Sequence, residues 1–148
     1  MIQSLTNEPL VLATNTSDIT FANTDIRTRS ANCNFPGWLQ HSDGSAQFTI
    51  LDGGLYKINF NANITSATTG VVALALKNNG VVVPATEVDS SVATADEYQN
   101  ISFTKTIRLC PRANSTITVG SIAAISGPGT ATQVPTVKNV NISIERIA

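Results

Sequence analysis

The chain has 148 residues and a formal net charge of −1, and only 13% of its residues are charged. One domain with a sizeable hydrophobic core is expected at this length. The near-neutral charge gives no electrostatic footprint for nucleic acid or an anionic membrane, and no apolar run of about 18 residues predicts a membrane span.

The first residues, MIQSLTNEPLVLAT, contain neither a basic segment nor a long apolar run, so they do not resemble a secretory signal. We therefore expect synthesis and folding in a cytoplasm. Residues 1–9 are interpreted as a polar lead, and the apolar run Leu10–Ala13 as a first strand. Asp18–Phe21 predicts a second short strand, because Ile19 and Phe21 alternate with polar residues.

The next segment, Asp25–Asp43, has no hydrophobic period and is expected to form a long loop. Long loops in compact domains are often functional, and this one contains the only tryptophan and the only histidine. A solvated loop surface is the simpler interpretation of its charges. The alternative is a partner contact, for which the candidate residues are Arg27, Arg29, Phe35, Trp38 and His41.

The most regular stretch is FTILDGGLYKINFNANI, residues Phe48–Ile64. From Tyr56 to Ile64 apolar residues alternate with lysine and asparagine, which predicts a strand with one buried face. The pair Gly53-Gly54 favours a tight turn, so a hairpin with a preceding strand at Phe48–Ile50 is predicted.

The run Val71–Leu76 is apolar at every position, which predicts a strand covered on both faces. Asn79-Gly80 is a strong hairpin signal, and Val81–Val83 is expected to form the return strand. Ala85–Ala95 is expected to be a loop with an edge strand near Val92.

Three further strands are predicted in the last third of the chain, at Tyr98–Leu109, Thr116–Ala124 and Val137–Ile147. In the first of these, Lys105 interrupts an otherwise apolar face. Helical spacing of apolar residues is absent from the sequence. About eight to ten short strands separated by turn signals predict an all-β sandwich.

No set of residues predicts catalysis or a cofactor. The single histidine, His41, has no carboxylate or cysteine at metal-ligand spacing, and no G-x-S-x-G elbow is present. We therefore predict that the protein is not an enzyme. Cys33 and Cys110 match no zinc or redox motif, which leaves separate burial or a disulfide formed outside a reducing compartment.

Four stretches taken together resemble the tumour-necrosis-factor-like jelly roll, which is the globular head of complement collagen-like proteins and of bacterial spore-surface collagen-like glycoproteins. These stretches are FTILDGGLYKINFNANI, VVALALKNNGVVVPATEV, ISFTKTIRLCPRANSTITVGSIA and the terminal NVNISIERIA. The segment RTRSANCNFPGWLQHSDGS resembles part of small proteins encoded with phage and prophage structural genes. The sequence departs from the stalked molecules because no Gly-X-Y repeat precedes the head.

The resemblance implies a homotrimer of ten-stranded antiparallel jelly rolls packed through apolar strands. A neighbouring subunit would supply the second cover that Val71–Leu76 requires, at about 1.5–3 kcal/mol per buried aliphatic side chain. The predicted interface residues are Val71, Val72, Leu74, Leu76, Val81, Val83 and Ile144.

The resulting hypothesis is a trimeric virion surface module, a phage capsid decoration or head-fibre protein, whose partners are itself and other virion proteins. Residues 23–42 and 85–96 are the loops expected to make contacts. The alternative is a receptor- or glycan-binding head on a phage tail or on a bacterial or spore surface. An exposed Trp38 would favour this alternative.

Overall fold

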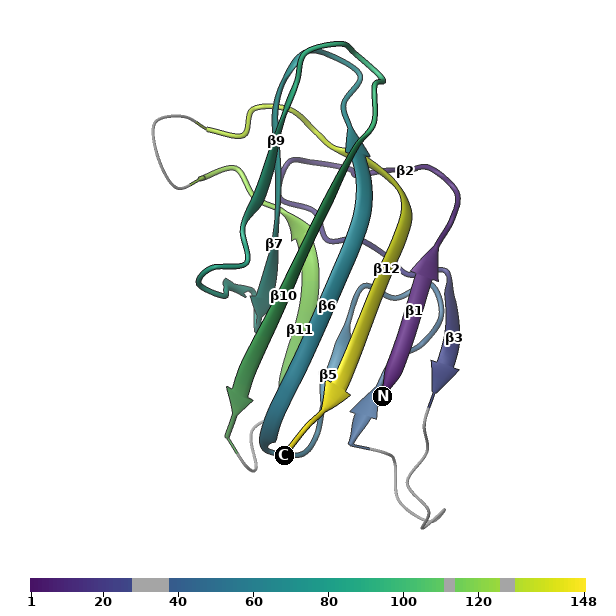
Figure 1. Cartoon of the computed structure of the whole chain (residues 1–148), viewed down its shortest axis with the longest axis vertical. Coiled ribbons are helices and arrows are strands. Elements are labelled where there is room, and N and C mark those ends of the chain that lie inside the picture. Colours follow the sequence, from purple (N-terminus) through teal and green to yellow (C-terminus); the bar gives the residue numbers. More distant parts are fainter. Residues whose placement is uncertain (28–37, 111–113, 126–129) are drawn as a thin grey trace.

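The structure is a computed structural model of the chain, and it describes residues 1–27, 38–110, 114–125 and 130–148. Within this part all regular structure is β-strand, and the strands form two antiparallel sheets stacked face to face (Figure 1). The predicted all-β sandwich is confirmed.

One sheet, here called the front sheet, has the strand order β10-β6-β12-β1-β3, with β2 pairing with β12. It lies nearer the viewer in Figure 1. Its strands are β1 (Ile2–Thr6), β2 (Leu10–Val11), β3 (Asn23–Arg27), β6 (Gly54–Thr65), β10 (Gln99–Leu109) and β12 (Thr136–Arg146).

The other sheet, the back sheet, has the order β4-β5-β11-β7-β8, with β9 pairing with β7. Its strands are β4 (Leu39–Gln40), β5 (Phe48–Ile50), β7 (Gly70–Asn78), β8 (Val81–Val82), β9 (Val88–Val92) and β11 (Ser115–Ser121). Connections that pass repeatedly from one sheet to the other produce a jelly-roll topology.

The hydrophobic core fills the space between the sheets. Strand β6 supplies Tyr56, Ile58, Phe60, Ala62 and Ile64 to it, and each is at most 2% exposed. The strict alternation of β6 therefore has the predicted cause, which is one buried and one open face. From the back sheet, core-facing side chains of β5, β7 and β11 meet them.

The predicted hairpin at Gly53-Gly54 is wrong. Strand β5 pairs with β4 and β11 in the back sheet, whereas β6 pairs with β10 and β12 in the front sheet. The glycine pair is therefore a crossing between sheets. Gly54 has a φ of 155°, and a Cβ there would lie 2.6 Å from the Ala148 carbonyl oxygen, so the tight contact with the C-terminal residues requires a glycine.

Residues 1–9, expected to be a polar lead, contain strand β1. It pairs with β12 on one side and β3 on the other, and it directs Ile2, Ser4 and Thr6 inward. The sequence IQSLT hides this strand because its inward positions are partly hydroxyl side chains. Thr6 is satisfied there by donating to the Thr20 carbonyl at 2.9 Å.

The predicted Asn-Gly hairpin is confirmed. Asn79 and Gly80 have φ values of 50° and 80° and connect β7 to β8, as a two-residue turn with positive φ requires. The Asn79 side chain also accepts a hydrogen bond from the Thr116 backbone N–H at 2.8 Å, which ties the turn to β11.

Candidate functional site

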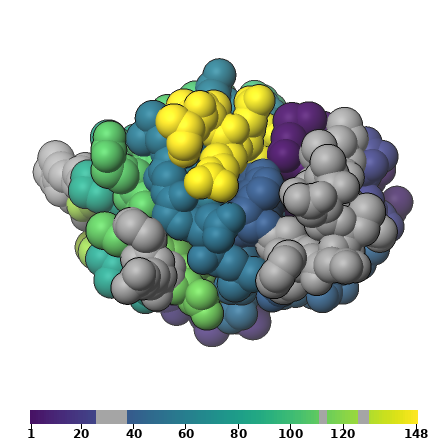
Figure 2. Space-filling model, turned by 90° about the horizontal axis from the view of Figure 1, so that it is seen from below, coloured from purple at the N-terminus to yellow at the C-terminus, as the bar shows by residue number. Residues whose placement is uncertain are grey.

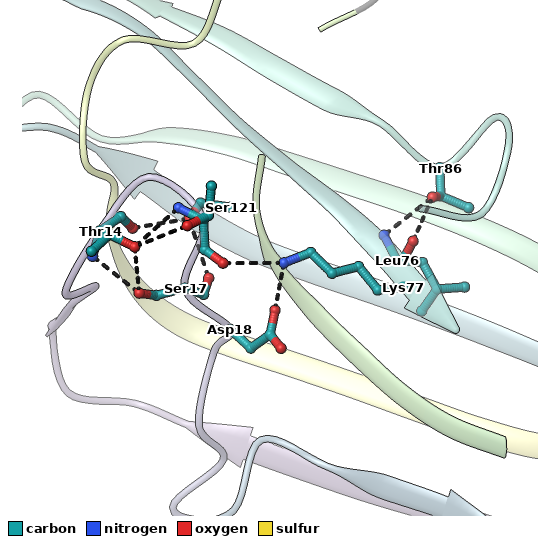
Figure 3. Close-up of polar contacts among 8 residues, drawn as sticks. Thr14, Ser17, Asp18, Leu76, Lys77, Thr86 and Ser121 are labelled. Carbon is teal, nitrogen blue, oxygen red and sulfur yellow. Dashed lines mark hydrogen bonds and ion pairs between the residues drawn. The ribbon is translucent and has the colours of Figure 1, made fainter. Parts of the chain in front are cut away.

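The outer face of the back sheet, the side away from the core, is covered by the chain itself. One such segment is residues 14–19, in which Asp18 forms an antiparallel bridge with Gly120, so that the segment pairs with the edge of β11 and its Asp18 side chain reaches Lys77. Ile19 donates its backbone N–H to Val119 at 2.8 Å, and Ser121 donates its N–H to the Ser17 carbonyl at 2.8 Å. The Ser121 hydroxyl also contacts the Thr14 and Ser17 carbonyls at 3.1 and 3.2 Å (Figure 3).

An ion pair fixes the same segment to β7. The Lys77 Nζ lies 2.6 Å from Asp18 Oδ1, with side-chain exposures of 10% and 33% (Figure 3). Beside it, Gly120 packs so closely that a Cβ would lie 2.7 Å from both the Asp18 Cα and the Ser17 carbonyl oxygen. Only the smallest residue allows residues 14–19 to lie this close to β11.

A second covering segment follows β11. The outward side chains Ala73 and Ala75 of β7 pack with Ile122 and Ala131 in a small separate cluster, and Val71 and Ile125 flank it. Backbone bonds from Ile122 N–H to the Ala73 carbonyl and from Gln133 N–H to the Val71 carbonyl hold it in place, at 3.1 and 3.2 Å.

These covers change the interpretation of the predicted interface residues. Strand β7 is covered on both faces, as predicted, but the second cover is intramolecular and not a neighbouring subunit. Val72, Leu74, Leu76 and Ile144 are 0% exposed in the single chain, so a partner could bury none of their surface. Val71 and Val83 are half-buried, and Val81 alone of the predicted set is fully exposed.

The outer face of the front sheet has no such cover in the described part of the chain, as Figure 1 shows. Apart from the charged residues Lys57, Arg108, Lys138 and Glu145, its outward positions are short polar side chains that oppose one another across strands. Paired in register are Asn63 with Asn100, Asn61 with Ser102, Asn59 with Thr104, Asn61 with Asn141 and Asn59 with Ser143. We call these residues the amide face: Asn59, Asn61, Asn63, Asn100, Ser102, Thr104, Asn141 and Ser143.

The amide face is ordered by its own hydrogen bonds. Asn100 donates to Asn63 Oδ1 at 2.9 Å and exchanges longer contacts with Asn61, at 3.2 and 3.4 Å. Asn59 accepts from the Thr104 hydroxyl at 2.9 Å and donates to the Ser143 hydroxyl at 3.1 Å. These contacts fix side-chain rotamers in advance, which lowers the entropy lost when a partner covers the surface.

The end of this face near the start of β10 has a different chemistry. The Lys138 ammonium lies 3.8 Å from the centroid of the Tyr98 ring, which is a cation–π contact. Lys138 stands on β12 next to Asn63 of β6 in the strand register. A cation and an aromatic ring therefore flank an otherwise uncharged row of amides.

The predicted contact loop is only partly described. Arg29 and Phe35 lie outside the described residues, and Arg27 is placed at the end of β3 without a described side chain. Trp38 is half-buried, and its ring packs against Tyr56 with centroids 5.3 Å apart. Trp38 therefore anchors the chain to the core.

His41 was predicted to be a surface contact, and this is wrong. It is 6% exposed, its ring stacks on Phe48 at 4.0 Å between centroids, and Nδ1 lies 2.8 Å from the Gln47 carbonyl oxygen. Phe21 packs edge-on against both rings. The imidazole is an element of core packing, because its flat ring fills a space between aromatic side chains.

Tyr56 is a titratable group within the core, where its side chain is fully buried. Burial raises the pKa of its hydroxyl; the nearby Arg146 opposes this pKa shift and Asp52 adds to it. The hydroxyl donates to the Asp52 carbonyl at 2.7 Å, so it is a satisfied core group and not a reactive one. Arg146 meanwhile donates to the Gly53 carbonyl at 3.0 Å and holds the end of β12 to the crossing.

The remaining observations concern metal ions, membranes and cysteines. Among the described residues, no group of three or more histidine, cysteine, aspartate or glutamate side chains is placed to hold a metal ion, and no helix is long and apolar enough to cross a membrane. Cys110 is exposed at the end of β10. Cys33 lies outside the described residues, so the disulfide alternative stays a prediction.

Comparison with known proteins finds likeness in structure only. No family model and no curated protein matches the sequence. Solved structures do match: the globular domain of zebrafish complement 1qA protein has 17% identity and a TM-score of 0.59, with 99% of this chain and 96% of that chain covered. Eiger TNF from S. frugiperda has 9% identity and a TM-score of 0.65, with coverages of 99% and 91%.

Murine APRIL gives a similar result, with 10% identity, a TM-score of 0.61 and coverages of 99% and 97%. The chain therefore has the jelly-roll fold of TNF-like and complement-head domains. This confirms the fold implied by the sequence resemblance.

The sequence did not predict the contacts that residues 14–19 make with Lys77 and Ser121. A weak signal exists, because Lys77 directly follows an apolar run on a strand that needs two covers, and a buried lysine requires an acidic partner. Nothing in the sequence identified Asp18 as that partner, since the two residues are distant along the chain.

Proposed function

We propose that the protein is a non-enzymatic structural module that assembles as a homotrimer and forms part of a virion surface, as a capsid decoration or head-fibre protein. The observation that supports self-association is the contrast between the two outer faces. The back sheet is covered by its own chain, whereas the amide face of the front sheet is open and nearly uncharged.

The open face is large enough for a stable contact. Strands β6, β10 and β12 have eleven or twelve residues and β1 and β3 have five, so a rise of about 3.3 Å per residue and a spacing of about 4.8 Å give a surface of roughly 700 Å². Stable interfaces bury about 800 Å² on each partner, so one face of this size is in the right range. The low charge density means that identical copies do not repel each other strongly.

The trimeric state itself is supported by the fold. The sequence resemblance implies a trimer for TNF-like heads, and the solved structures with this fold cover the whole chain. The virion context is supported by sequence alone, through the resemblance of RTRSANCNFPGWLQHSDGS to proteins encoded with phage structural genes. Other virion proteins are the partners that this context implies.

The glycan- or receptor-binding alternative loses its main support. An exposed Trp38 would favour it, but Trp38 is half-buried and packs its ring on Tyr56. A structural role therefore accounts better for the described residues.

The test is the mass of the protein in solution, measured by size-exclusion chromatography with light scattering. We expect three chains for the wild type and one chain for Asn61→Arg, because Asn61 is exposed in the middle of the amide face. Thr49→Arg, on the outer side of β5 in the back sheet, is the matched control and should stay trimeric. A monomeric wild type, or dissociation by the control as well, would contradict the proposal.

The virion context needs a separate measurement. Purified virions from a phage whose genome encodes this chain should contain it, detected by mass spectrometry and by immunogold labelling of the outer surface. Labelling absent from intact particles would remove the virion role while leaving the trimer in place.

A further inference from the structure

The sequence contains one Asn-Gly pair, Asn79-Gly80, which forms the turn between β7 and β8. Asparagine is one of the chemically labile residues of proteins, and a following glycine increases this lability, because glycine has no Cβ to shield its backbone nitrogen. Both residues are exposed, and a Cβ built on Gly80 would meet no atom within 4 Å. Water therefore reaches this turn from outside.

The reaction available to such a pair is the loss of the side-chain amide. The Gly80 backbone nitrogen gives its proton to solvent and bonds to Asn79 Cγ, the bond from Cγ to the amide nitrogen breaks, and ammonia leaves with a proton taken from solvent. The product is a succinimide ring. Water then opens the ring at either of its carbonyls and gives aspartate or isoaspartate at position 79, so the reaction consumes water and releases ammonia.

The closed turn keeps the attacking nitrogen away from the carbon that it must reach. Asn79 and Gly80 have φ values of 50° and 80°, as in a two-residue turn of type I′. In such a turn the ψ of the first central residue is about 30°, which directs the next nitrogen away from the Cβ. Reacting atoms must approach within about 3–3.5 Å in the correct orientation, so Asn79 has to leave the turn conformation first.

Two hydrogen bonds from β11 oppose this change. The Asn79 N–H donates to the Thr116 carbonyl at 2.8 Å, and the Thr116 N–H donates to Asn79 Oδ1 at 2.8 Å. The side-chain amide of Asn79 thus takes the place of a main-chain carbonyl and continues the ladder that pairs Asn78 with Ile117. Rotation of Asn79 toward the reactive geometry breaks the bond from the Thr116 N–H, so the turn must detach from β11 before the ring closes.

We propose that Asn79 is a site of spontaneous conversion to aspartate and isoaspartate, and that detachment of the β7–β8 turn from β11 controls the rate. The closed turn does not react, whereas the open turn reacts as an unfolded chain does. The fraction of converted chains therefore records the total time that the turn has been open. This inference goes beyond the structural role proposed above and does not depend on it.

The two products have different effects on the hairpin. An aspartate carboxylate keeps an oxygen that accepts the Thr116 N–H, so the turn closes again. Isoaspartate carries the chain through its side-chain carbon and adds a CH₂ group to the backbone. A two-residue turn between the paired residues Asn78 and Val81 has no room for this longer backbone. Isoaspartate therefore leaves the turn detached from β11.

The experiment is peptide mapping by mass spectrometry of the full-length chain, incubated at constant pH and temperature either folded or denatured in guanidinium chloride. The peptide containing position 79 is followed for the mass gain of amide-to-acid conversion, and chromatography separates isoaspartate from aspartate. We expect both products in both samples, with conversion about tenfold slower or more in the folded chain, and slowed by the same factor as hydrogen exchange of the Asn79 N–H. Asn79→Gln cannot form the succinimide and should show no conversion there.

Thr116→Pro tests the control by β11, because it removes the N–H that donates to Asn79 Oδ1. Thr116 is the second residue of β11, and proline is better tolerated at the start of a strand than in its middle. We expect conversion several-fold faster than in the wild type, with an equal loss of hydrogen-exchange protection at Asn79. Thr116→Val keeps the backbone N–H, so this matched control should convert at the wild-type rate.

Three results would overturn the proposal. The first is a folded wild-type chain that converts as fast as the denatured chain. The second is a folded Thr116→Pro variant that converts no faster than the wild type, and the third is aspartate without isoaspartate, because hydrolysis would then bypass the succinimide. If Thr116→Pro does not fold, the comparison of conversion with hydrogen exchange in the wild type decides, and unequal slowing of the two overturns the control by turn opening.

Discussion

The outer faces of the two sheets avoid exposing apolar side chains to water in different ways. Strand β7 of the back sheet buries both of its faces, one against the core and one against Ile122, Ala131 and the Asp18 carboxylate of the same chain. Strand β6 of the front sheet buries one face and covers the other with asparagine and lysine. Both strands are central to their sheets, so position alone does not decide the pattern.

A strand without alternation indicates that both of its faces are buried. It does not indicate whether the second face is buried by another subunit or by the same chain. A neighbouring subunit and a returning loop remove the same apolar area from water, and the sequence of the strand is identical in both cases. The surface proposed for assembly is the outer face of the sheet whose strands do alternate.

The largest loss in the free energy of unfolding is expected for a truncation in the core shared by the two sheets. Tyr56→Ala removes a side chain that is 0% exposed and packs against Trp38, so we expect a loss of about 3–5 kcal/mol in chemical denaturation. A loss below about 1 kcal/mol would contradict the placement of β6 in the core.

Tyr56→Phe is the matched control, with a loss of about 0.5–1.5 kcal/mol for the hydrogen bond to Asp52. The raised pKa of Tyr56 means that the folded chain holds this proton more tightly than the unfolded chain. Its contribution is complete below about pH 10 and is lost as the pH rises through the folded-state pKa. Tyr56→Phe should remove that alkaline component of the stability.

The covered face should be sensitive to a single methyl group. Gly120→Ala places a Cβ within 2.7 Å of backbone atoms of Ser17 and Asp18, so residues 14–19 must move away from β11. We expect a loss of about 1–3 kcal/mol and faster amide hydrogen exchange at Ile19 and Ser121. Gly80→Ala is a poor control, because the positive φ of Gly80 would strain an alanine there. Ala124→Gly is a better control, because Ala124 is exposed.

The two residues of the Lys77–Asp18 ion pair should differ in how much their substitution lowers stability. Asp18→Asn leaves the Lys77 ammonium, 10% exposed, without its anion, and we expect a loss of about 1–2 kcal/mol, less than for a fully buried pair because Asp18 is partly exposed. Lys77→Met removes the charge that needs a partner and should change the stability by less than about 1 kcal/mol. Equal losses in the two variants would mean that the pair itself, and not the buried charge, determines the effect.

The open face should show the smallest change in stability. Asn61→Arg, which we expect to dissociate the trimer, should shift the free energy of unfolding of the isolated chain by less than about 0.5 kcal/mol, because Asn61 is exposed. Denaturation at low protein concentration, where the chains are separate, measures this value. A larger loss would indicate that the amide face is needed for folding and not for assembly.

The sequence predicts those parts of the fold in which local pattern and tertiary role agree. The alternation of Tyr56–Ile64, the turn at Asn79-Gly80 and the edge strand near Val92 are all present as expected. Lys105 looked like an irregularity, and it becomes understandable once β10 is known to be an edge strand.

The remaining parts depend on contacts between distant residues. Gly53-Gly54 satisfies the requirements of a hairpin, but whether β5 and β6 pair is decided by their competing partners β11 and β12. The strand at Ile2–Thr6 has hydroxyl groups at inward positions and becomes identifiable only when β12 lies beside it. His41 was a candidate contact residue because it lies in the irregular segment Asp25–Asp43, and its stacking on Phe48 could not be deduced from its neighbours in sequence.

The pairing of β1 with β12 has a mechanical consequence. Ile2 lies opposite Ile144 in an antiparallel register, and both ends of the described chain emerge from the same end of the molecule (Figures 1 and 2). A force that pulls the two ends apart first loads the contacts of Ile147 and Ala148 with Leu55 and then opens the β1–β12 ladder one hydrogen bond at a time. Such unzipping needs little force, so a molecule pulled by its two ends would open early. A molecule pulled by one end and by a different part of its surface would not load the β1–β12 ladder in this direction.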